Sequence, residues 1–357
     1  MRHHRSIYCI LPPQVLDRIA RNGSEEQRRR ALDTLSRDHA VRAARIHNLA
    51  RRAPGAIPRV NALAAPGMDN ARRTIFDAKG TEQWTGNIVR SEGGDPTGDA
   101  AADEAYDGLG DTYHLYSAAF QRDSIDGRGL PLDGVVHFDQ NYDNAFWDGT
   151  EMVFGDGDGE LFNRFTISVD VIGHELTHGV TENETGLFYF YQSGALNESI
   201  SDVFGSLVKQ MKLNQTADEA DWLIGEGLLA EGVQGVALRS MKDPGTAFDD
   251  PVLGKDDQPA KMDDFVYTYS DNGGVHTNSG IPNHAFYLAA NNLGGYAWDK
   301  AGHIWYHALQ DPRVRPTTRF RGFARATQRA AATLFHGETA DEVKAVTEAW
   351  YEVGVLD

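Results

Sequence analysis

Two histidines and the glutamate between them, in the segment His174-Glu175-Leu176-Thr177-His178, have the types and spacing of a hydrolytic metal centre. Side chains four residues apart on an α-helix lie on one face, about a turn apart, so both imidazoles can reach one cation. Zinc that hydrolyses amides is held by three protein ligands and keeps a fourth position open. Glu175 can face that open side and act as a base. The segment therefore predicts a zinc site on a helix.

A third ligand is expected in the downstream segment Asn197-Glu198-Ser199-Ile200-Ser201-Asp202. Zinc proteases with three histidines place the third one six residues after the second, where this chain has Glu184. Glu198 is the better candidate, because its carboxylate is anionic and a second helix can present it. Asp202, one helical turn further on, and Asn197 are suited to hold the ligand imidazoles in place. The alternative is that these residues are core histidines and solvated helix acids.

Several ordered segments resemble the thermolysin family of zinc metalloproteases. They are Asn144-Ala145-Phe146-Trp147, GDGDG at 155–159, HELTHGVTE at 174–182, SGALNESISDVFG at 193–205 and DNGGVHTNSGIPNHAFYL at 271–288. The likeness runs from about Arg73 to the C-terminus, and the short N-terminal segment with Pro12-Pro13 resembles the protealysin branch. The resemblance implies one catalytic zinc ion held by His174, His178 and Glu198.

The resemblance also implies roles for residues around that site. Glu175 would take a proton from the attacking water and later deliver it to the leaving amine, as general base and then acid. Tyr189 and His276 would donate to the developing oxyanion. Asp271, five residues before His276, would orient its imidazole. Outside this motif, His276 would be expected to be a structural loop histidine.

Substrate preference follows from the same resemblance. Asn144 and Ala145 lie where an extended peptide would pair with an edge strand. The pocket for the residue after the scissile bond would be lined by Phe162, Phe165, Val171, Ile224 and Leu238, with Arg239 below. These bulky apolar positions predict cleavage before hydrophobic residues, although each one alone would be expected in an ordinary core.

The chain departs from the family at a calcium site. Asp170, Asp221 and Glu226 resemble acidic ligands of the family's double calcium site, but Lys209 and Leu223 occupy two other ligand positions. An ammonium repels a dication and can neutralise the same carboxylates. We therefore expect at most one calcium ion there. Asp156 and Asp158 also look like calcium ligands, but Asp-Gly runs are usually turns.

Charge is divided unevenly along the 357 residues, whose formal net charge is -18. Residues 1–59 hold 13 Arg, no Lys and five acidic residues, which gives +8, and the remainder carries -26. A basic arm usually suggests nucleic acid, but the acidic body would repel phosphates, so we expect the arm to bind the body itself. A charge bias without function is the alternative. A hydrophobic content of 41% and a mean hydropathy of -0.47 exclude a polytopic membrane protein.

The N-terminal residues bear on the cellular compartment. Cys9 is the only cysteine, so no intrachain disulfide can form. The apolar run from Ile7 to Leu11 stops at Pro12 and Pro13, which is too short for a secretory signal. We therefore expect synthesis in the cytoplasm, with release by another route left open.

The elements that must position these residues divide into two lobes and an appendage. Residues 24 to about 50 predict a helix with a Ser24–Gln27 capping box, followed by a linker to about Gly67. Strand patterns lie within 73–154, interrupted by a helix over 99–120, and helical patterns dominate from 167 onward. We predict an α+β, thermolysin-like fold. Its parts are a prosegment and the start of the linker (1–55), a β-rich lobe that includes the zinc helix (56–182) and a helical lobe (183–357).

The first fifty-odd residues are interpreted as a removable inhibitor. We expect this segment to dock on the catalytic body, with Pro12-Pro13 near the cleft, until the chain is cut between about Arg45 and Asn61. Prolines lack amide donors and hold an extended path, which helps a segment cross a cleft uncut. Cys9 is a candidate thiolate ligand for zinc, or else packs as a small hydrophobe.

Three functions remain open at this point. The leading hypothesis is a zinc endopeptidase made as a self-processed precursor, acting on proteins and peptides, with no nucleic-acid or membrane partner. A zinc aminopeptidase would use a similar metal site but needs an acidic subsite for the free amine, and none is evident near residue 144. A non-catalytic, zinc-stabilised binding protein would not need Glu175 or His276, and both are present.

Overall fold

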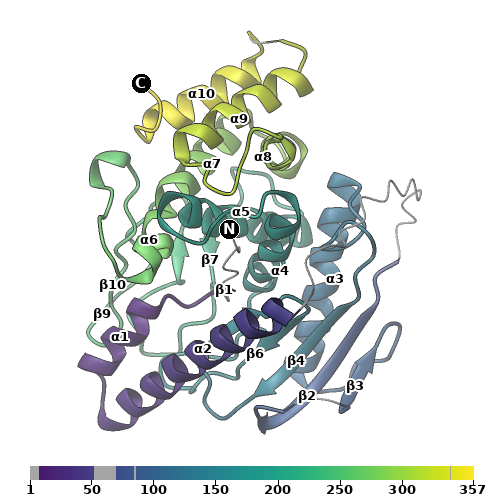
Figure 1. Cartoon of the computed structure of the whole chain (residues 1–357), viewed down its shortest axis with the longest axis vertical. Helices are drawn as coiled ribbons and strands as arrows, with labels where there is room; N and C mark the ends of the chain where they lie inside the picture. Colours follow the sequence, from purple (N-terminus) through teal and green to yellow (C-terminus); the bar gives the residue numbers. More distant parts are fainter. Residues whose placement is uncertain (1–7, 52–69, 84–85, 338) are drawn as a thin grey trace.

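The computed structural model describes residues 8–51, 70–83, 86–337 and 339–357, and Figure 1 shows how their elements are arranged. The predicted cleavage region and linker, about 45–67, lie largely outside the described residues. The C-terminal helices gather at the top of Figure 1 and the large sheet lies in its lower part. The main sheet is completed by residue 154 and helices dominate from Val169 onward, which confirms the predicted α+β class. Among the described residues, no helix has both the length and the apolar character needed to cross a membrane.

A six-stranded sheet forms most of the N-terminal lobe, in the order β1-β5-β6-β4-β2-β3. Its strands are β1 (Tyr8–Cys9), β2 (Arg73–Thr81), β3 (Ile88–Ser91), β4 (Leu132–Phe138), β5 (Ala145–Trp147) and β6 (Glu151–Phe154). β4 pairs in parallel with both β2 and β6, and the other neighbours are antiparallel. The edge strand β1 comes from the N-terminal segment, so this segment covers the edge of β5.

Helices surround the sheet and build the second lobe. Their bounds are α1 (Pro13–Asn22), α2 (Glu25–Arg51), α3 (Ala100–Phe120), α4 (Val169–Glu184), α5 (Tyr191–Leu213), α6 (Asp271–Asn278), α7 (Gly280–Leu293), α8 (His303–Gln310), α9 (Phe320–Leu334) and α10 (Asp341–Glu352). Short 3-10 and π turns, Met262–Asp264 and Trp298–Gly302, and two small hairpins, β7–β8 (Leu223–Ile224 with Arg239–Ser240) and β9–β10 (Asp249–Asp250 with Gly254–Lys255), complete the fold. α3 packs on β2, β4 and α4, and α4 packs on α5.

The crossing of α4 and α5 depends on two glycines. A Cβ on Gly173 would lie 3.0 Å from the Cα of Gly205, and a Cβ on Gly205 would lie 2.4 Å from the carbonyl oxygen of Asp170. The two helix backbones therefore touch at a point where no side chain fits. About two turns before Gly205, Glu198 lies opposite the two histidines of α4.

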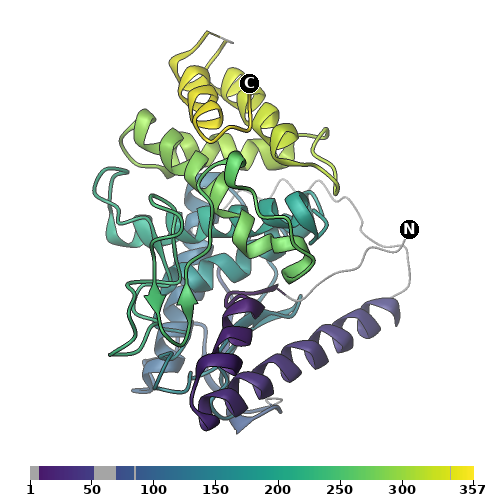
Figure 2. The same cartoon turned by 90° about the vertical axis from the view of Figure 1, so that its left-hand side faces the viewer.

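The N-terminal residues form a strand and a helical hairpin that dock against the body, as Figure 2 shows. The predicted helix from 24 begins at Glu25. The expected capping box is present, because the Gln27 side chain accepts from the Ser24 N–H at 2.8 Å and the Ser24 hydroxyl accepts from the Gln27 N–H at 3.2 Å. Helix α1 was not predicted. It begins at Pro13, where a fixed φ suits the first helical position and the missing N–H has no cost.

Candidate active site

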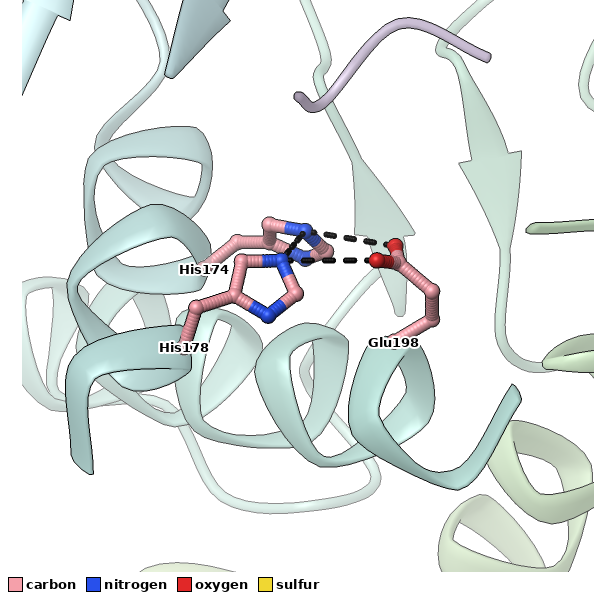
Figure 3. Close-up of side chains that lie close together, drawn as sticks. All are labelled: His174, His178 and Glu198. Carbon is pink, nitrogen blue, oxygen red and sulfur yellow. Dashed lines mark hydrogen bonds and ion pairs between the residues drawn. The ribbon is translucent and has the colours of Figure 1, made fainter. Parts of the chain in front are cut away.

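Three side chains from two helices converge on one point. The His174 and His178 Nε2 atoms lie 3.0 Å apart, and the Glu198 carboxylate oxygens lie 3.5 Å and 3.4 Å from them respectively. Figure 3 shows the two imidazoles from α4 and the carboxylate from α5 pointing toward one another. All three residues are fully buried. The structure thus brings together the three predicted metal ligands.

Hydrogen bonds at the far side of each imidazole fix its orientation. The Asp202 carboxylate lies 2.8 Å from Nδ1 of His174, and the Asn197 side-chain oxygen lies 2.8 Å from Nδ1 of His178. Both acceptors favour the tautomer with the proton on Nδ1. The guanidinium of Arg239, at 2.8 Å, keeps the pKa of Asp202 below its usual range even though burial alone would raise it. The Nε2 lone pairs therefore face the Glu198 carboxylate.

This arrangement requires a cation. Two imidazole nitrogens without protons and a carboxylate face one another, and Glu198 Oε2 has no hydrogen-bond partner among the described residues. Burial and the neighbouring His174 lower the pKa of His178 well below its usual value, so that a proton on this ring does not relieve the repulsion. Two imidazoles and one carboxylate form a donor set that zinc prefers in catalytic sites. A zinc ion therefore fits these three side chains.

Glu175 lies beside this centre with one carboxylate oxygen available. Its Oε2 accepts from the Trp147 N–H at 3.1 Å, whereas its Oε1 has no hydrogen-bond partner in the part of the chain that the structure describes. Complete burial, together with the Glu198 carboxylate, raises the pKa of Glu175 well above its usual value. A carboxylate with a raised pKa is a stronger base toward water.

His276, Asp271 and Tyr189 form a second polar group, which contacts the metal ligand Glu198. The Asp271 carboxylate accepts from Nδ1 of His276 at 2.7 Å and from its backbone N–H at 2.8 Å. Burial lowers the pKa of His276, but Asp271 and Glu198 outweigh it and raise the pKa to about 9. His276 Nε2 lies 3.1 Å from the Tyr189 hydroxyl, which also donates to Glu198. Donors therefore gather at one place beside the metal ligands.

The loop before His276 explains why its sequence contains two glycines. Asp271, Asn272, Gly273 and Gly274 have φ values of 50°, 49°, 87° and 75°, all in the left-handed region. Glycine adopts this region without strain, and Asn and Asp tolerate it better than other residues. The turn allows Asp271 to reach back to the His276 ring.

The N-terminal segment pairs with the cleft by backbone hydrogen bonds. Ile10 donates to the Ala145 carbonyl at 3.4 Å, and Leu11 donates to the Asn144 side-chain oxygen at 3.1 Å. Arg239 donates to the Ile10 carbonyl at 3.0 Å. The Cys9 carbonyl lies 3.1 Å from His276 Nε2. Residues 9–11 therefore occupy the path of an extended peptide across the site.

The predicted specificity residues lie close to this segment. Phe162, Phe165, Val171, Ile224 and Leu238 are all buried in the main apolar core, to which Ile10 and Leu11 also belong. Of the five, Leu238 lines a small cavity together with Pro12. Arg239 is paired with Asp202 and is also buried. Pro12 lines a small cavity together with Arg239 and His276, and Pro13 begins α1. Only Pro12 therefore continues the extended path along the cleft.

Cys9 does not point toward the metal ligands. Its side chain packs in a separate apolar cluster with Phe138, Tyr142 and Phe146, and the metal-ligand group does not include it. Side chains alternate along a strand, so Ile10 joins the main core while Cys9 faces away. This corrects the predicted thiolate ligation of zinc, and the alternative of a packed small hydrophobe is the one that the structure favours.

Lys209 occupies the middle of the predicted calcium cluster. Its ammonium lies 2.6 Å from Asp221, 2.9 Å from Glu226 and 3.7 Å from the buried Asp170. Burial lowers the pKa of Lys209, but the three carboxylates outweigh it and raise the pKa above its usual value. Leu223 contributes only its backbone N–H, which donates to Asp221 at 2.9 Å.

Some residues of the site were not predicted. Asn283 donates to Asp202 at 2.8 Å, and the Ser201 hydroxyl lies 3.0 Å from Nδ1 of His178. The buried Asp38 of α2 accepts from Tyr142 at 2.6 Å and from the Asn144 amide at 3.1 Å. Helical spacing from Asn197 could have suggested Ser201. No local pattern pointed to Asp38, which lies more than a hundred residues from its partners.

Family models match most of the chain. The model of the thermolysin metallopeptidase catalytic domain matches residues 66–182, and that of the thermolysin metallopeptidase alpha-helical domain matches residues 185–355. A protealysin propeptide model matches residues 8–37.

Individual relatives are similar over nearly the whole chain. An extracellular metalloprotease of Pectobacterium carotovorum subsp. carotovorum is 52% identical over 98% of this chain and 97% of its own length. Protease PrtS of Photorhabdus sp. is 48% identical over 97% of this chain and 91% of its own. The solved structure of the precursor of protealysin, a metalloproteinase from Serratia proteamaculans, is 53% identical, with a TM-score of 0.87 over 98% of this chain and 100% of that one.

Proposed function

Since the chain belongs to the thermolysin family of zinc metallopeptidases, we propose that it cleaves peptide bonds before bulky hydrophobic residues. We also propose that its own N-terminal segment blocks the cleft until this segment is cut off. Members of this family are zinc endopeptidases, and this chain is one of them. The observation that carries the proposal is the buried group of His174, His178 and Glu198 with Glu175 beside it.

Each side chain has a separate task in the proposed mechanism. His174, His178 and Glu198 would hold a zinc ion, which would supply Lewis-acid chemistry toward the scissile carbonyl and a bound water molecule. The open Oε1 of Glu175 takes the proton from the attacking water and then returns it to the leaving amine. Tyr189 and His276 donate to the oxyanion that develops on the attacked carbonyl, and Asp271 keeps the His276 ring in place.

The path of residues 8–12 favours an endopeptidase over an aminopeptidase. The Cys9 carbonyl lies beside His276 and the Ile10 carbonyl accepts from Arg239. Tyr8 pairs with Trp147 before these residues, and Leu11 donates to Asn144 after them. The cleft thus accommodates peptide chain on both sides of the catalytic centre. An aminopeptidase would close one side to bind the free amine.

The apolar pocket supports the proposed preference for hydrophobic residues. Its five apolar residues belong to the core cluster that already accommodates the Ile10 and Leu11 side chains. Arg239 donates to the backbone carbonyl next to this pocket, so it fixes the register of a peptide without reading its side chains.

The prosegment is proposed to inhibit by occupying the substrate path. Its residues 9–11 engage Asn144, Ala145, Arg239 and His276, the same groups that a peptide substrate would need. Ion pairs from α1 and α2 to the body, including Arg18 with Asp257 and Arg30 with Glu160, agree with the opposite charges of the two parts. We propose that cleavage in or near 45–61 releases the segment. We also propose that the chain has domain boundaries at about residues 55 and 182, which separate the prosegment, the β-rich lobe and the helical lobe.

The remaining proposals concern calcium and location. We propose that the Asp170–Asp221–Glu226 cluster binds at most one calcium ion, because the Lys209 ammonium already neutralises its carboxylates. We also propose that the enzyme acts outside the cell, since one of its relatives is named an extracellular metalloprotease.

An internally quenched peptide with blocked termini tests the proposed activity. The processed enzyme should cleave it before Leu or Phe, and removal of zinc by a chelator should abolish the cleavage. A parallel peptide with Asp at that position should be cleaved at least ten times more slowly. Cleavage that requires a free N-terminus would instead identify an aminopeptidase. No cleavage at all would support a non-catalytic, zinc-stabilised binding protein.

A further inference from the structure

A second acidic group lies beneath the edge of the cleft, where the prosegment provides the opposite charge. It consists of Asp158 and Glu160, which the Arg30 guanidinium of α2 contacts, and of Asp143, whose neighbour Tyr142 accepts from the Gly157 N–H at 3.3 Å. Arg30 NH1 lies 3.2 Å from Glu160 and 3.7 Å from Asp158. The side chain of Arg30 is 13% exposed, and that of Asp158 is 1% exposed.

Two carboxylate oxygens in this group have no other partner. Asp143 is 2% exposed, and its Oδ1 has no hydrogen-bond partner among the described residues. Asp158 Oδ1 accepts from the N–H groups of Glu160, Leu161 and Phe162 at 2.9, 2.7 and 3.1 Å, whereas its Oδ2 accepts no hydrogen bond within the described part of the chain. Buried carboxylate oxygens without partners carry a large desolvation cost unless a cation is present.

Removal of the prosegment takes this cation away. Three carboxylates then remain without the guanidinium, on a body that carries -26 without residues 1–59. In the precursor, the Asp158 and Glu160 carboxylates lie beside the guanidinium. Among the described residues, only the zinc ligands bring three metal-ligating groups within 4.8 Å of one another. The three carboxylates are therefore farther apart than metal ligands while Arg30 is bound, and a smaller ion requires them to move closer together.

We propose that Asp143, Asp158 and Glu160 bind a calcium ion in the processed enzyme, and that Arg30 takes the place of this ion in the precursor. Calcium prefers carboxylate oxygens and tolerates irregular coordination, and waters complete its shell. The turn that carries Asp158 and Glu160 lies between Gly157 and the buried Phe162. Since Gly157 and Gly159 adopt φ values of 72° and 68°, the turn is compatible with an Asp-Gly calcium loop.

The site would also stabilise the substrate cleft. Asp143 lies between Tyr142 and Asn144, and in the precursor Asp38 of α2 holds the side chains of both neighbours. All these contacts are lost with the prosegment. A calcium ion on Asp143 would fix the same tripeptide after processing, so that Asn144 remains placed for substrate.

Calcium binding to four full-length chains tests the proposal. All carry Glu175→Gln, which prevents self-processing, so the result does not depend on the peptidase activity. The Arg30→Met chain should bind one calcium ion more than its parent and gain thermal stability in millimolar calcium. The Arg30→Lys chain, which keeps the charge, should not. Adding Asp158→Asn to Arg30→Met should abolish the gain, because Asn retains the Oδ1 acceptor of the turn and loses only the charge.

The measurement is equilibrium dialysis against radioactive calcium at constant ionic strength, with circular dichroism as the control for folding. No additional calcium in a folded Arg30→Met chain would overturn the proposal, as would a gain that survives Asp158→Asn. If Arg30→Met does not fold, processed wild-type enzyme and processed Asp158→Asn enzyme replace it. The proposal then requires one calcium ion fewer in the variant, and equal binding refutes it. Lys209 is unchanged in every chain, so the Asp170–Asp221–Glu226 cluster contributes equally throughout.

Discussion

Replacing Asp38 with Ala should release the prosegment from the cleft without changing the catalytic body. The Asp38 carboxylate is 2% exposed and accepts hydrogen bonds from Tyr142 at 2.6 Å and from Asn144 at 3.1 Å. The change therefore removes at least the net gain of these two hydrogen bonds to a charged acceptor. At about 1.5 kcal/mol or more for each bond, docking should weaken by about 3 kcal/mol, which is about 100-fold.

The assay uses a ligand that competes with the prosegment. In a full-length Glu175→Gln chain, a peptide analogue can bind only to the undocked fraction, so its apparent affinity rises in proportion to that fraction. Isothermal titration should show binding about 100-fold tighter for Asp38→Ala than for its parent. Asp33→Ala is the matched control, since Asp33 is an exposed aspartate on the same helix. Equal affinities in the Asp38 and Asp33 variants would refute the inference that Asp38 holds the prosegment in place.

Two further predictions concern charged groups away from the cleft. Lys209→Met leaves the buried Asp170 beside two uncompensated carboxylates, so the free energy of unfolding should fall by about 3 kcal/mol, with partial recovery in calcium. The free energies are measured by denaturant titration, in which Lys209→Arg should retain most of the stability. An unchanged free energy of unfolding in Lys209→Met would contradict the inference that the Lys209 ammonium compensates these carboxylates. The hydrogen bond to Asp156, followed by that to Asp99, raises the pKa of His137 to about 9. The protonated ring therefore stabilises the fold fully below about pH 6.5, its unfolded pKa, and this contribution is lost as the pH rises through about 9. Solvent screening of the half-exposed aspartates should limit it to about 1 kcal/mol. In the His137→Gln variant, the free energy of unfolding should vary less over that pH range. An unaltered pH profile would show that the contacts of His137 with the two aspartates do not cause the pH dependence.

The helical spacing of His174 and His178 was enough to predict their shared orientation, because four residues make about one turn of any α-helix. Glu198 and Asp202 are also four residues apart, on a second helix. Their meeting with α4 could not be calculated from spacing alone. It depends on the crossing at Gly173 and Gly205, which is a long-range contact between backbones.

The prosegment shows the limits of local patterns more clearly. Its docking on the body was expected from charge, and its helix from 24 was expected from the capping box. Its register in the cleft was not, because Leu11 and Asn144 are 133 residues apart. The choice between the two predicted roles of Cys9 also depended on this register. Once β1 pairs with β5, strand alternation directs its side chain away from the metal ligands and leaves only its carbonyl near His276.

The central claim is that Glu175 moves the proton at a zinc site that His174, His178 and Glu198 hold, and one paired measurement tests it. Glu175→Gln precursor is processed by a trace of tagged wild-type enzyme, which is then removed. Zinc content and turnover of the quenched peptide are determined on the same sample. We predict zinc bound as in the wild type, with turnover lowered by about 100- to 10,000-fold. Wild-type turnover, or loss of the zinc together with the activity, would contradict the account.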